Sequence, residues 1–174
     1  LLLNGLREVH SNKLLHLDIK PANIYIRNDC TPVLIDFGAA RQTLTSEGFK
    51  LNPMYTPGFA SPEHYQKRDL LGPWSDIYSV GASLFACLAG AAPQAADLRM
   101  ERDRYVSATK LFAGKYSTQL LETIDWCLQL DHLQRPQSVM ALQKVLLRER
   151  EPEGPRKRSF VANLRSTLMR LARR

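Results

Sequence analysis

Two short motifs near the start of the chain constrain its fold and chemistry more than any other feature. They are His16-Leu17-Asp18-Ile19-Lys20-Pro21-Ala22-Asn23 and Ile35-Asp36-Phe37-Gly38. Pro21 fixes its own φ and biases the residue before it toward extended geometry, so the first motif is expected to be a loop. The run Val33-Leu34-Ile35 is typical of a short buried strand that ends at Asp36. Gly38 would then permit the backbone turn that follows.

These motifs resemble those of the protein kinase superfamily, and specifically the C-terminal lobe of a serine/threonine kinase. The first matches H-R-D-x-x-x-x-N in all but one position, where Leu17 stands in place of arginine. The resemblance implies that Asp18 is the catalytic base, that Asn23 and Asp36 bind Mg²⁺, and that ATP is the phosphate donor. Carboxylate and amide oxygens are ligands that magnesium prefers. A plain structural interpretation would leave Asp18 solvated and place Asn23 in an Asx-turn, but several motifs in the right order favour the kinase interpretation.

Two more residues of the resemblance bear on the substrate class. In serine/threonine kinases a lysine two residues after the catalytic aspartate contacts the transferred phosphate. A threonine near the end of the activation segment hydrogen-bonds into the same loop, and Lys20 and Thr56 occupy the matching positions. The resemblance therefore implies a catalytic and nucleotide-binding role for Lys20 and hydroxyl acceptors on serine or threonine. It also implies that His16 is a packed, hydrogen-bonded support residue.

Landmarks further along the chain agree with this resemblance. Ser61-Pro62-Glu63 resembles the Ala-Pro-Glu end of an activation segment, and Arg135 resembles the family's late arginine. A guanidinium can meet a carboxylate bidentately, so we expect Glu63 and Arg135 to pair. Ser75 is expected to cap a helix whose first turn holds Asp76. By resemblance Asp76 binds the backbone of the catalytic loop, although a plain N-terminal helix acid would look the same in sequence.

The remaining pattern predicts a mainly helical fold. Apolar residues at helical spacing mark helices at 2–9, at 77–88 with Gly90 as a stop, at 120–128, and at 139–146 after a Ser138 cap. Between residues 91 and 116 the apolar pattern is weak, and a charged run predicts an exposed helix: Arg99, Glu101, Arg102, Asp103 and Arg104. The fold class we expect is mainly α, of the α+β kind. It is the C-lobe of a protein kinase, a helical bundle with a small β-hairpin at the catalytic loop.

Two features depart from the kinase pattern. Neither a glycine-rich loop nor a V-A-I-K lysine precedes the catalytic motifs. We therefore expect residues 1–150 to be a C-terminal lobe with the N-lobe absent, and this fragment to be inactive by itself. Leu17 carries no charge that could bind a phosphate on the activation segment, where Thr43, Thr45 and Ser46 lie.

The net charge is concentrated at the end of the chain. Residues 151–174 carry +5 of the chain's net charge of +7 and begin with a Pro/Gly-containing linker. Phe160, Leu164, Leu168 and Leu171 then recur at helical spacing among arginines. Such a basic amphipathic tail can lie on an anionic membrane or bind a partner groove, and a flexible basic tail without a fixed partner is an equal interpretation. A membrane-surface or nucleic-acid module would rest on this tail alone, and we expect no specific nucleic acid.

The cysteines and the hydropathy pattern bear on the compartment. Cys30, Cys87 and Cys127 are widely spaced and form no metal-binding pair, and the last two fall among apolar helical residues. We expect Cys87 and Cys127 to be inert core thiols in a reducing compartment. No stretch of the sequence is long and apolar enough to span a membrane. The predicted location is cytoplasmic, with any membrane association supplied by sequence outside this chain.

Taken together, the motifs predict a serine/threonine protein kinase that transfers the γ-phosphate of ATP, with Mg²⁺, to protein substrates. The alternative is a catalytically inactive pseudokinase or protein-binding scaffold that keeps the lobe for protein recognition. Intact Asp18, Asn23 and Asp36 argue against that alternative, because loss of kinase activity commonly removes one of these residues.

Overall fold

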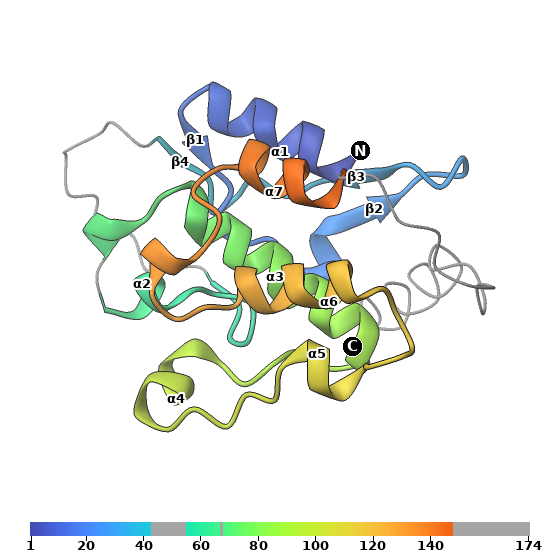
Figure 1. The fold of residues 1–174 in the computed structure, drawn as a ribbon. Coiled ribbons are helices and arrows are strands. Elements are labelled where there is room, and N and C mark those ends of the chain that lie inside the picture. Colours follow the sequence, from blue (N-terminus) through green and yellow to red (C-terminus); the bar gives the residue numbers. More distant parts are fainter. Residues whose placement is uncertain (43–54, 67, 148–174) are drawn as a thin grey trace.

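Most of the regular secondary structure is helical in the computed structural model, which describes residues 1–42, 55–66 and 68–147. The α-helices are α1 (Leu2–Ser11), α2 (Pro62–Tyr65), α3 (Pro73–Ala89), α4 (Ala96–Glu101), α5 (Ala108–Leu111), α6 (Thr118–Cys127) and α7 (Val139–Leu146). The 3-10 turns are η1 (Pro21–Asn23), η2 (Arg68–Leu70) and η3 (His132–Gln134), and the strands are β1 (Leu14–Leu15), β2 (Ile24–Ile26), β3 (Pro32–Leu34) and β4 (Arg41–Gln42). The mainly α class predicted from the sequence is confirmed (Figure 1).

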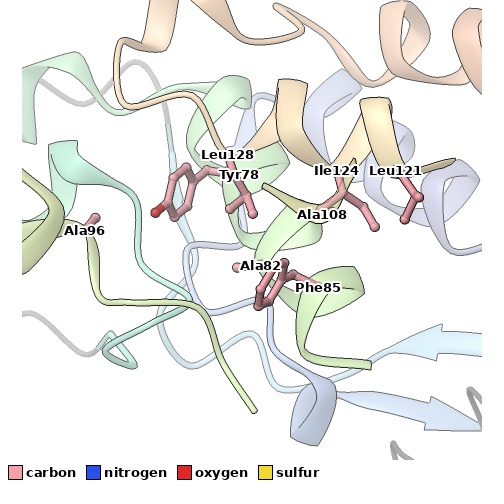
Figure 2. Packing of buried hydrophobic residues seen from close by; sticks show 8 residues of the cluster. All are labelled: Tyr78, Ala82, Phe85, Ala96, Ala108, Leu121, Ile124 and Leu128. Carbon is pink, nitrogen blue, oxygen red and sulfur yellow. The ribbon is translucent and has the colours of Figure 1, made fainter. Parts of the chain in front are cut away.

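Helix α3 is the centre of the core, and the other helices pack around it. On one side its residues join α6, α4 and α5 in a cluster (Figure 2) that comprises Tyr78, Ala82, Phe85, Ala96, Ala108, Leu121, Ile124 and Leu128. On the other side a second cluster includes Leu6 of α1, Ile19 of the first motif, Ile77 and Val80 of α3, and Val139 and Leu142 of α7. The loop that carries the first motif is therefore anchored in the core through Ile19, which is almost fully buried.

The contact between α3 and α6 depends on a glycine. A Cβ placed on Gly81 would lie 2.5 Å from the Cβ of Cys127, so only glycine fits where these two helices approach. Cys87 and Cys127 are buried as predicted, and burial raises the pKa of each thiol to about 12. Such thiols are protonated at neutral pH and unreactive.

The start of α3 differs from the prediction. Ser75 was the expected N-cap, but this is wrong, because the helix begins at Pro73 and Gly72 takes the cap position. Proline suits the first position of a helix, where its missing N–H would have no helical partner. Ser75 instead closes the first turn from inside, since its Oγ accepts the Gly72 N–H at 3.2 Å. The helix ends as predicted at Gly90, whose φ of 77° is left-handed.

Two small antiparallel sheets flank the first motif. In the sheet that connects the two motifs, β2 pairs with β3, so that Ile24 lies opposite Leu34 and Ile26 opposite Pro32. In the other sheet β1 pairs with β4. The buried strand predicted at residues 33–35 is wrong in its burial, because β3 ends at Leu34, is only half-buried, and leaves Ile35 42% exposed. A two-stranded hairpin has one open face unless another element covers it.

The exposed helix predicted around residues 99–104 is confirmed in part: α4 ends at Glu101, and Glu101, Arg102, Asp103 and Arg104 are exposed, but the prediction is wrong for Arg99. Arg99 lies in α4 and is only 5% exposed. Its guanidinium donates to the Leu128 carbonyl at 2.8 Å and to both carboxylate oxygens of Asp103 at 3.0 Å, and it lies 4.5 Å from the ring centre of Tyr105. A buried guanidinium is tolerated where a carboxylate and a carbonyl satisfy its donors.

Several predictions concern residues outside the described part of the chain. Thr43, Thr45 and Ser46 fall there, and so does the basic tail at 151–174. The domain boundary at residue 150 therefore stays a prediction. Among the described residues, none of the helices combines the length and the apolar character needed to cross a bilayer.

Candidate active site

The carboxylate of Asp18 lies at the centre of the predicted site and is held by three donors. Thr56 Oγ1 donates to its Oδ1 at 2.8 Å, and Lys20 Nζ donates to its Oδ2 at 2.7 Å. Lys20 also donates to Thr56 Oγ1 at 2.7 Å, so the three side chains form a closed triangle. The third donor is Asn23 Nδ2, at 3.1 Å from Oδ2. A partly exposed carboxylate held in this way can accept a hydrogen bond from an incoming hydroxyl without first reorganising.

The loop places Asn23 beside the second motif. Its Nδ2 also donates to the Asp18 carbonyl at 2.8 Å, and its own carbonyl accepts the Ile35 N–H at 3.0 Å. Asn23 is therefore bonded to the residue directly before Asp36. In the turn that follows Ile35, Asp36 is the left-handed residue, with φ of 62°, whereas the φ of Gly38 is not positive. Gly38 lies in the turn that follows, as predicted, and the Ala40 N–H closes that turn on the Phe37 carbonyl at 3.0 Å. Asp36 Oδ1 accepts the Gly38 N–H at 3.1 Å, which stabilises the left-handed Asp36 as an Asx-turn.

Two side-chain oxygens near this backbone contact are of a kind that binds a hard divalent cation. Within residues 1–42, 55–66 and 68–147, no group bonds to Asn23 Oδ1 or to Asp36 Oδ2, and Asp36 is exposed. One neutral amide oxygen and one carboxylate oxygen are ligands that Mg²⁺ accepts when water and phosphate oxygens complete its shell. The donor set thus agrees with the metal predicted from the sequence.

His16 connects the two motifs and is fully buried. Its Nε2–H donates to the Ile35 carbonyl at 3.1 Å, and its ring lies 4.7 Å from the ring of Phe37. The Asp18 N–H points at Nδ1 from 3.4 Å, which matches a neutral ring with its proton on Nε2. The prediction of a packed, hydrogen-bonded support residue is confirmed.

Asp76 binds the backbone of the loop from α3. Its two carboxylate oxygens accept the N–H groups of His16 at 2.9 Å and Leu17 at 2.8 Å. His10 of α1 donates to the same carboxylate through Nε2 at 2.8 Å. The sequence predicted the contact of Asp76 with the loop, whereas it gave no signal for His10, whose partner is 66 residues away.

Leu17 lies on the apolar side of the loop, where the resembling motif has arginine. Its side chain is buried and packs in a small cluster with Leu15, Ala39 and Leu71. Its φ is 65°, which is uncommon for a residue with a branched side chain. Leu17 thus contributes packing at the base of the site, and no charge.

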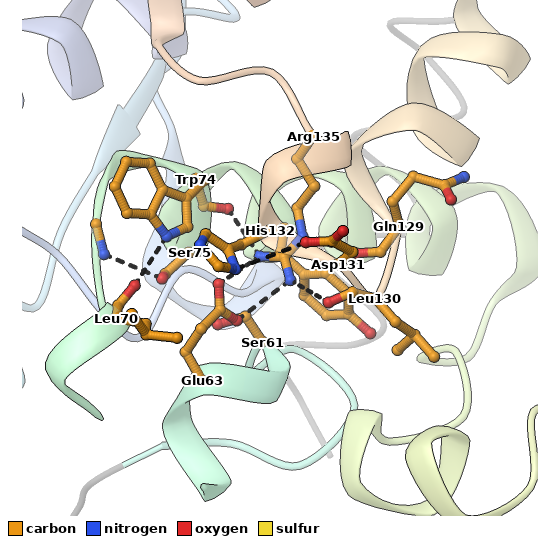
Figure 3. A network of polar contacts seen from close by, with 12 residues as sticks. Ser61, Glu63, Leu70, Trp74, Ser75, Gln129, Leu130, Asp131, His132 and Arg135 are labelled. Atoms are coloured by element: carbon orange, nitrogen blue, oxygen red, sulfur yellow. Dashed lines mark hydrogen bonds and ion pairs between the residues drawn. The ribbon is translucent and has the colours of Figure 1, made fainter. Parts of the chain in front are cut away.

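The predicted pair of Glu63 and Arg135 is confirmed and fixes α2 to the helical body (Figure 3). Arg135 NH1 and NH2 donate to the two oxygens of Glu63 at 2.9 and 3.2 Å, and both residues are nearly inaccessible. The remaining donors of the guanidinium bind the carbonyls of Gln129, Leu130 and Trp74. Helix α2 begins six residues after Thr56, so this pair anchors the chain near the threonine of the Asp18 triangle.

The sequence and the fold were compared with those of known proteins. Residues 1–147 match a family model described as the protein kinase domain. The serine/threonine-protein kinase PknA of Nostoc sp. is 40% identical over 100 residues, which are 53% of this chain and 17% of the relative. The stk11 homolog of Dictyostelium discoideum, a serine/threonine-protein kinase, is 32% identical over 138 residues, which are 77% of this chain and 24% of the relative.

A solved structure is similar over most of the described fold. The apo form of PpkA-294 superposes with a TM-score of 0.71 and 34% sequence identity, covering 83% of this chain and 50% of that chain. The chain thus spans about a quarter or less of the length of the two curated relatives and half of the solved one.

Proposed function

The chain belongs to the protein kinase domain family, and from this premise we propose that its protein transfers the γ-phosphate of ATP to serine or threonine hydroxyls of other proteins. The observation that carries the proposal is the triangle of Asp18, Lys20 and Thr56. It joins a carboxylate to the one lysine and the one threonine whose positions indicate the serine/threonine class.

Each residue of the site has a role that its geometry supports. Asp18 would orient the acceptor hydroxyl and receive its proton, because its carboxylate is partly exposed and already fixed by donors. Lys20 Nζ lies beside the Asp18 carboxylate, and from there its flexible side chain would contact the transferred phosphate. Phosphoryl transfer depends almost wholly on such positioning and on charge stabilisation.

The oxygens of Asn23 and Asp36 would hold Mg²⁺. The metal would supply neutralisation of the phosphate charge that builds up during transfer. Asn23 has a second task, since its amide nitrogen binds the Asp18 carbonyl and side chain. One asparagine therefore ties the metal position to the position of the carboxylate.

The test uses the natural protein with whatever sequence precedes and follows these residues. Labelled ATP and a generic protein substrate are supplied with Mg²⁺, and Asp18→Asn is compared with the unsubstituted protein. We expect transfer to fall by about a thousandfold or more, since general base catalysis and orientation are both lost, while nucleotide binding persists. Equal transfer by both proteins would refute the role of Asp18. If the unsubstituted protein bound nucleotide but transferred no phosphate, the scaffold alternative would be favoured.

A further inference from the structure

The peptide bond between Leu17 and Asp18 sets the direction of the proposed catalytic carboxylate. Leu17 has a left-handed backbone with φ of 65°, which a branched residue adopts only when its surroundings hold it there. On the N-terminal side the hold comes from Asp76, whose Oδ1 accepts the Leu17 N–H at 2.8 Å. The C-terminal side of the residue needs a second contact, because its carbonyl belongs to the same peptide group as the Asp18 nitrogen.

His64 of α2 supplies that contact. Its Nε2 lies 3.2 Å from the Leu17 carbonyl oxygen, which can only accept, so the proton of the ring is on Nε2. Its Nδ1 is then the acceptor, and the hydroxyl of Ser61, at 2.9 Å, is the donor that fits it. Ser61 thus selects the tautomer that binds the loop, in the way a second partner commonly orients a histidine.

The surroundings of His64 keep the ring neutral. The side chain is 5% exposed, and desolvation lowers its pKa below the usual value although the carboxylates of Asp76 and Glu63 act in the opposite direction. The ring of Tyr55 lies 6.0 Å away and adds no charge at neutral pH. A neutral ring with a single N–H has one hydrogen bond to donate, and Leu17 receives it.

We propose that His64 is a positioning residue for phosphoryl transfer, and that its bond to the Leu17 carbonyl fixes the peptide from which the Asp18 side chain extends. The inference rests on the proposed function, since it concerns the carboxylate assigned there. It also gives α2 a second connection to the site, besides the anchoring of the helix by Glu63 and Arg135. His64 would act through the backbone of Leu17 and would not touch substrate.

The experiment compares His64→Leu with His64→Gln in the natural protein. Leucine removes the donor, whereas glutamine carries an N–H at a similar reach and can restore the bond to the carbonyl. His132→Leu is the matched control, because this histidine stacks on Trp74 at 5.6 Å and makes no described contact with the loop. Each variant is assayed for kcat, for KM toward ATP and toward protein substrate, and for binding of MgATP.

A positioning role predicts a specific pattern. His64→Leu should lower kcat by about tenfold to a hundredfold, the range expected when a reacting group is displaced, with both KM values and MgATP binding within about threefold of the parent. His64→Gln should regain most of the lost kcat, and His132→Leu should match the parent. Ser61→Ala should lower kcat by a smaller factor, because the tautomer that binds the loop is no longer selected.

Other patterns would overturn the inference, and they are distinguishable from failure of the proposed function. An unchanged kcat in His64→Leu, in a protein where Asp18→Asn abolishes transfer, would remove the positioning role alone. If kcat and the fraction of protein that binds MgATP fell by the same factor in His64→Leu, with no recovery in His64→Gln, His64 would be required for folding and would have no separate positioning role. An absence of transfer by the unsubstituted protein would overturn both proposals.

Discussion

Loss of the carboxylate of Glu63 should destabilise this fold far more than loss of a similar carboxylate elsewhere in it. Glu63 is 4% exposed and Arg135 is 2% exposed, and they form a two-bond pair at 2.9 and 3.2 Å. Breaking a buried pair by removing one partner costs about 3–5 kcal/mol, because the other charge stays buried. Three backbone carbonyls still bind Arg135 after Glu63→Ala, so we expect the lower end, about 3 kcal/mol.

Asp103→Ala is the matched comparison. Asp103 also binds an arginine through two bonds, both at 3.0 Å, but its own side chain is 43% exposed. Arg99 is also buried, at 5% exposed, but water can enter where an exposed carboxylate stood and bind the guanidinium, so the expected loss is about 1 kcal/mol or less. The two bonds of each pair are alike and both arginines are buried, so the comparison measures the exposure of the carboxylates. Asp103 Oδ1 also accepts the Tyr105 N–H at 2.9 Å, and the loss of that bond adds to the effect of Asp103→Ala.

Urea denaturation followed by circular dichroism gives both values. With a slope of about 2 kcal/mol per molar urea, the Glu63→Ala midpoint should fall by about 1.5 M and the Asp103→Ala midpoint by about 0.5 M or less. Glu63→Gln should lie between them, because an amide keeps one acceptor for the guanidinium. Equal midpoints for Glu63→Ala and Asp103→Ala would refute the argument that burial decides the strength of these pairs.

Three further predictions concern the metal, the packing and the pH response. Asp36→Asn should weaken nucleotide binding by about tenfold or more when Mg²⁺ is present and should change it little without Mg²⁺. The reason is that asparagine tolerates the left-handed turn but lacks the charge that binds the metal. Titration of the nucleotide with and without Mg²⁺ measures the difference. Gly81→Ala should cost about 1–3 kcal/mol by overpacking against α6, whereas Gly5→Ala in α1, where a Cβ meets nothing within 4 Å, should stabilise by up to about 1 kcal/mol in the same denaturation assay. Because burial lowers the pKa of His64, the unfolded protein binds more protons there, so the free energy of unfolding should fall as the pH drops below about 6.5. Denaturation at pH 6 and at pH 8 measures this fall, and the part of it due to His64 should be absent in His64→Gln.

The arrangement of the candidate site could be predicted from the sequence because its contacts are local, whereas the roles of its residues in binding and catalysis stay predictions. Asp18, Asn23 and Asp36 come together through one loop and one hairpin, which are local in sequence and therefore predictable. The pair of Glu63 and Arg135 was predictable for a different reason. Both residues lie in motifs whose family pattern pairs them, although 72 residues separate them.

The sequence missed one distant contact and one local contact. Arg99 was expected in an exposed helix from its charged neighbours, but the Leu128 carbonyl, 29 residues away, binds its guanidinium in the interior. Gly38 lies in the predicted turn, but the wide backbone freedom of glycine is not used there. The left-handed residue is Asp36, because a side chain that bonds to the backbone two residues on offsets the strain of its own φ.

The left-handed backbone of Leu17 explains why the support of this site is spread over several helices. Successive N–H groups of extended backbone point to opposite sides, yet the N–H groups of His16 and Leu17 converge on the one carboxylate of Asp76. That convergence requires the chain to leave extended geometry at His16, whose two backbone torsions separate these nitrogens, and the left-handed φ of Leu17 then turns the chain toward Asp18. A strained residue persists only when its surroundings determine its conformation. Here α3 binds the nitrogen of Leu17 and α2 binds its carbonyl, so the direction of the Asp18 carboxylate depends on how these two helices are packed together.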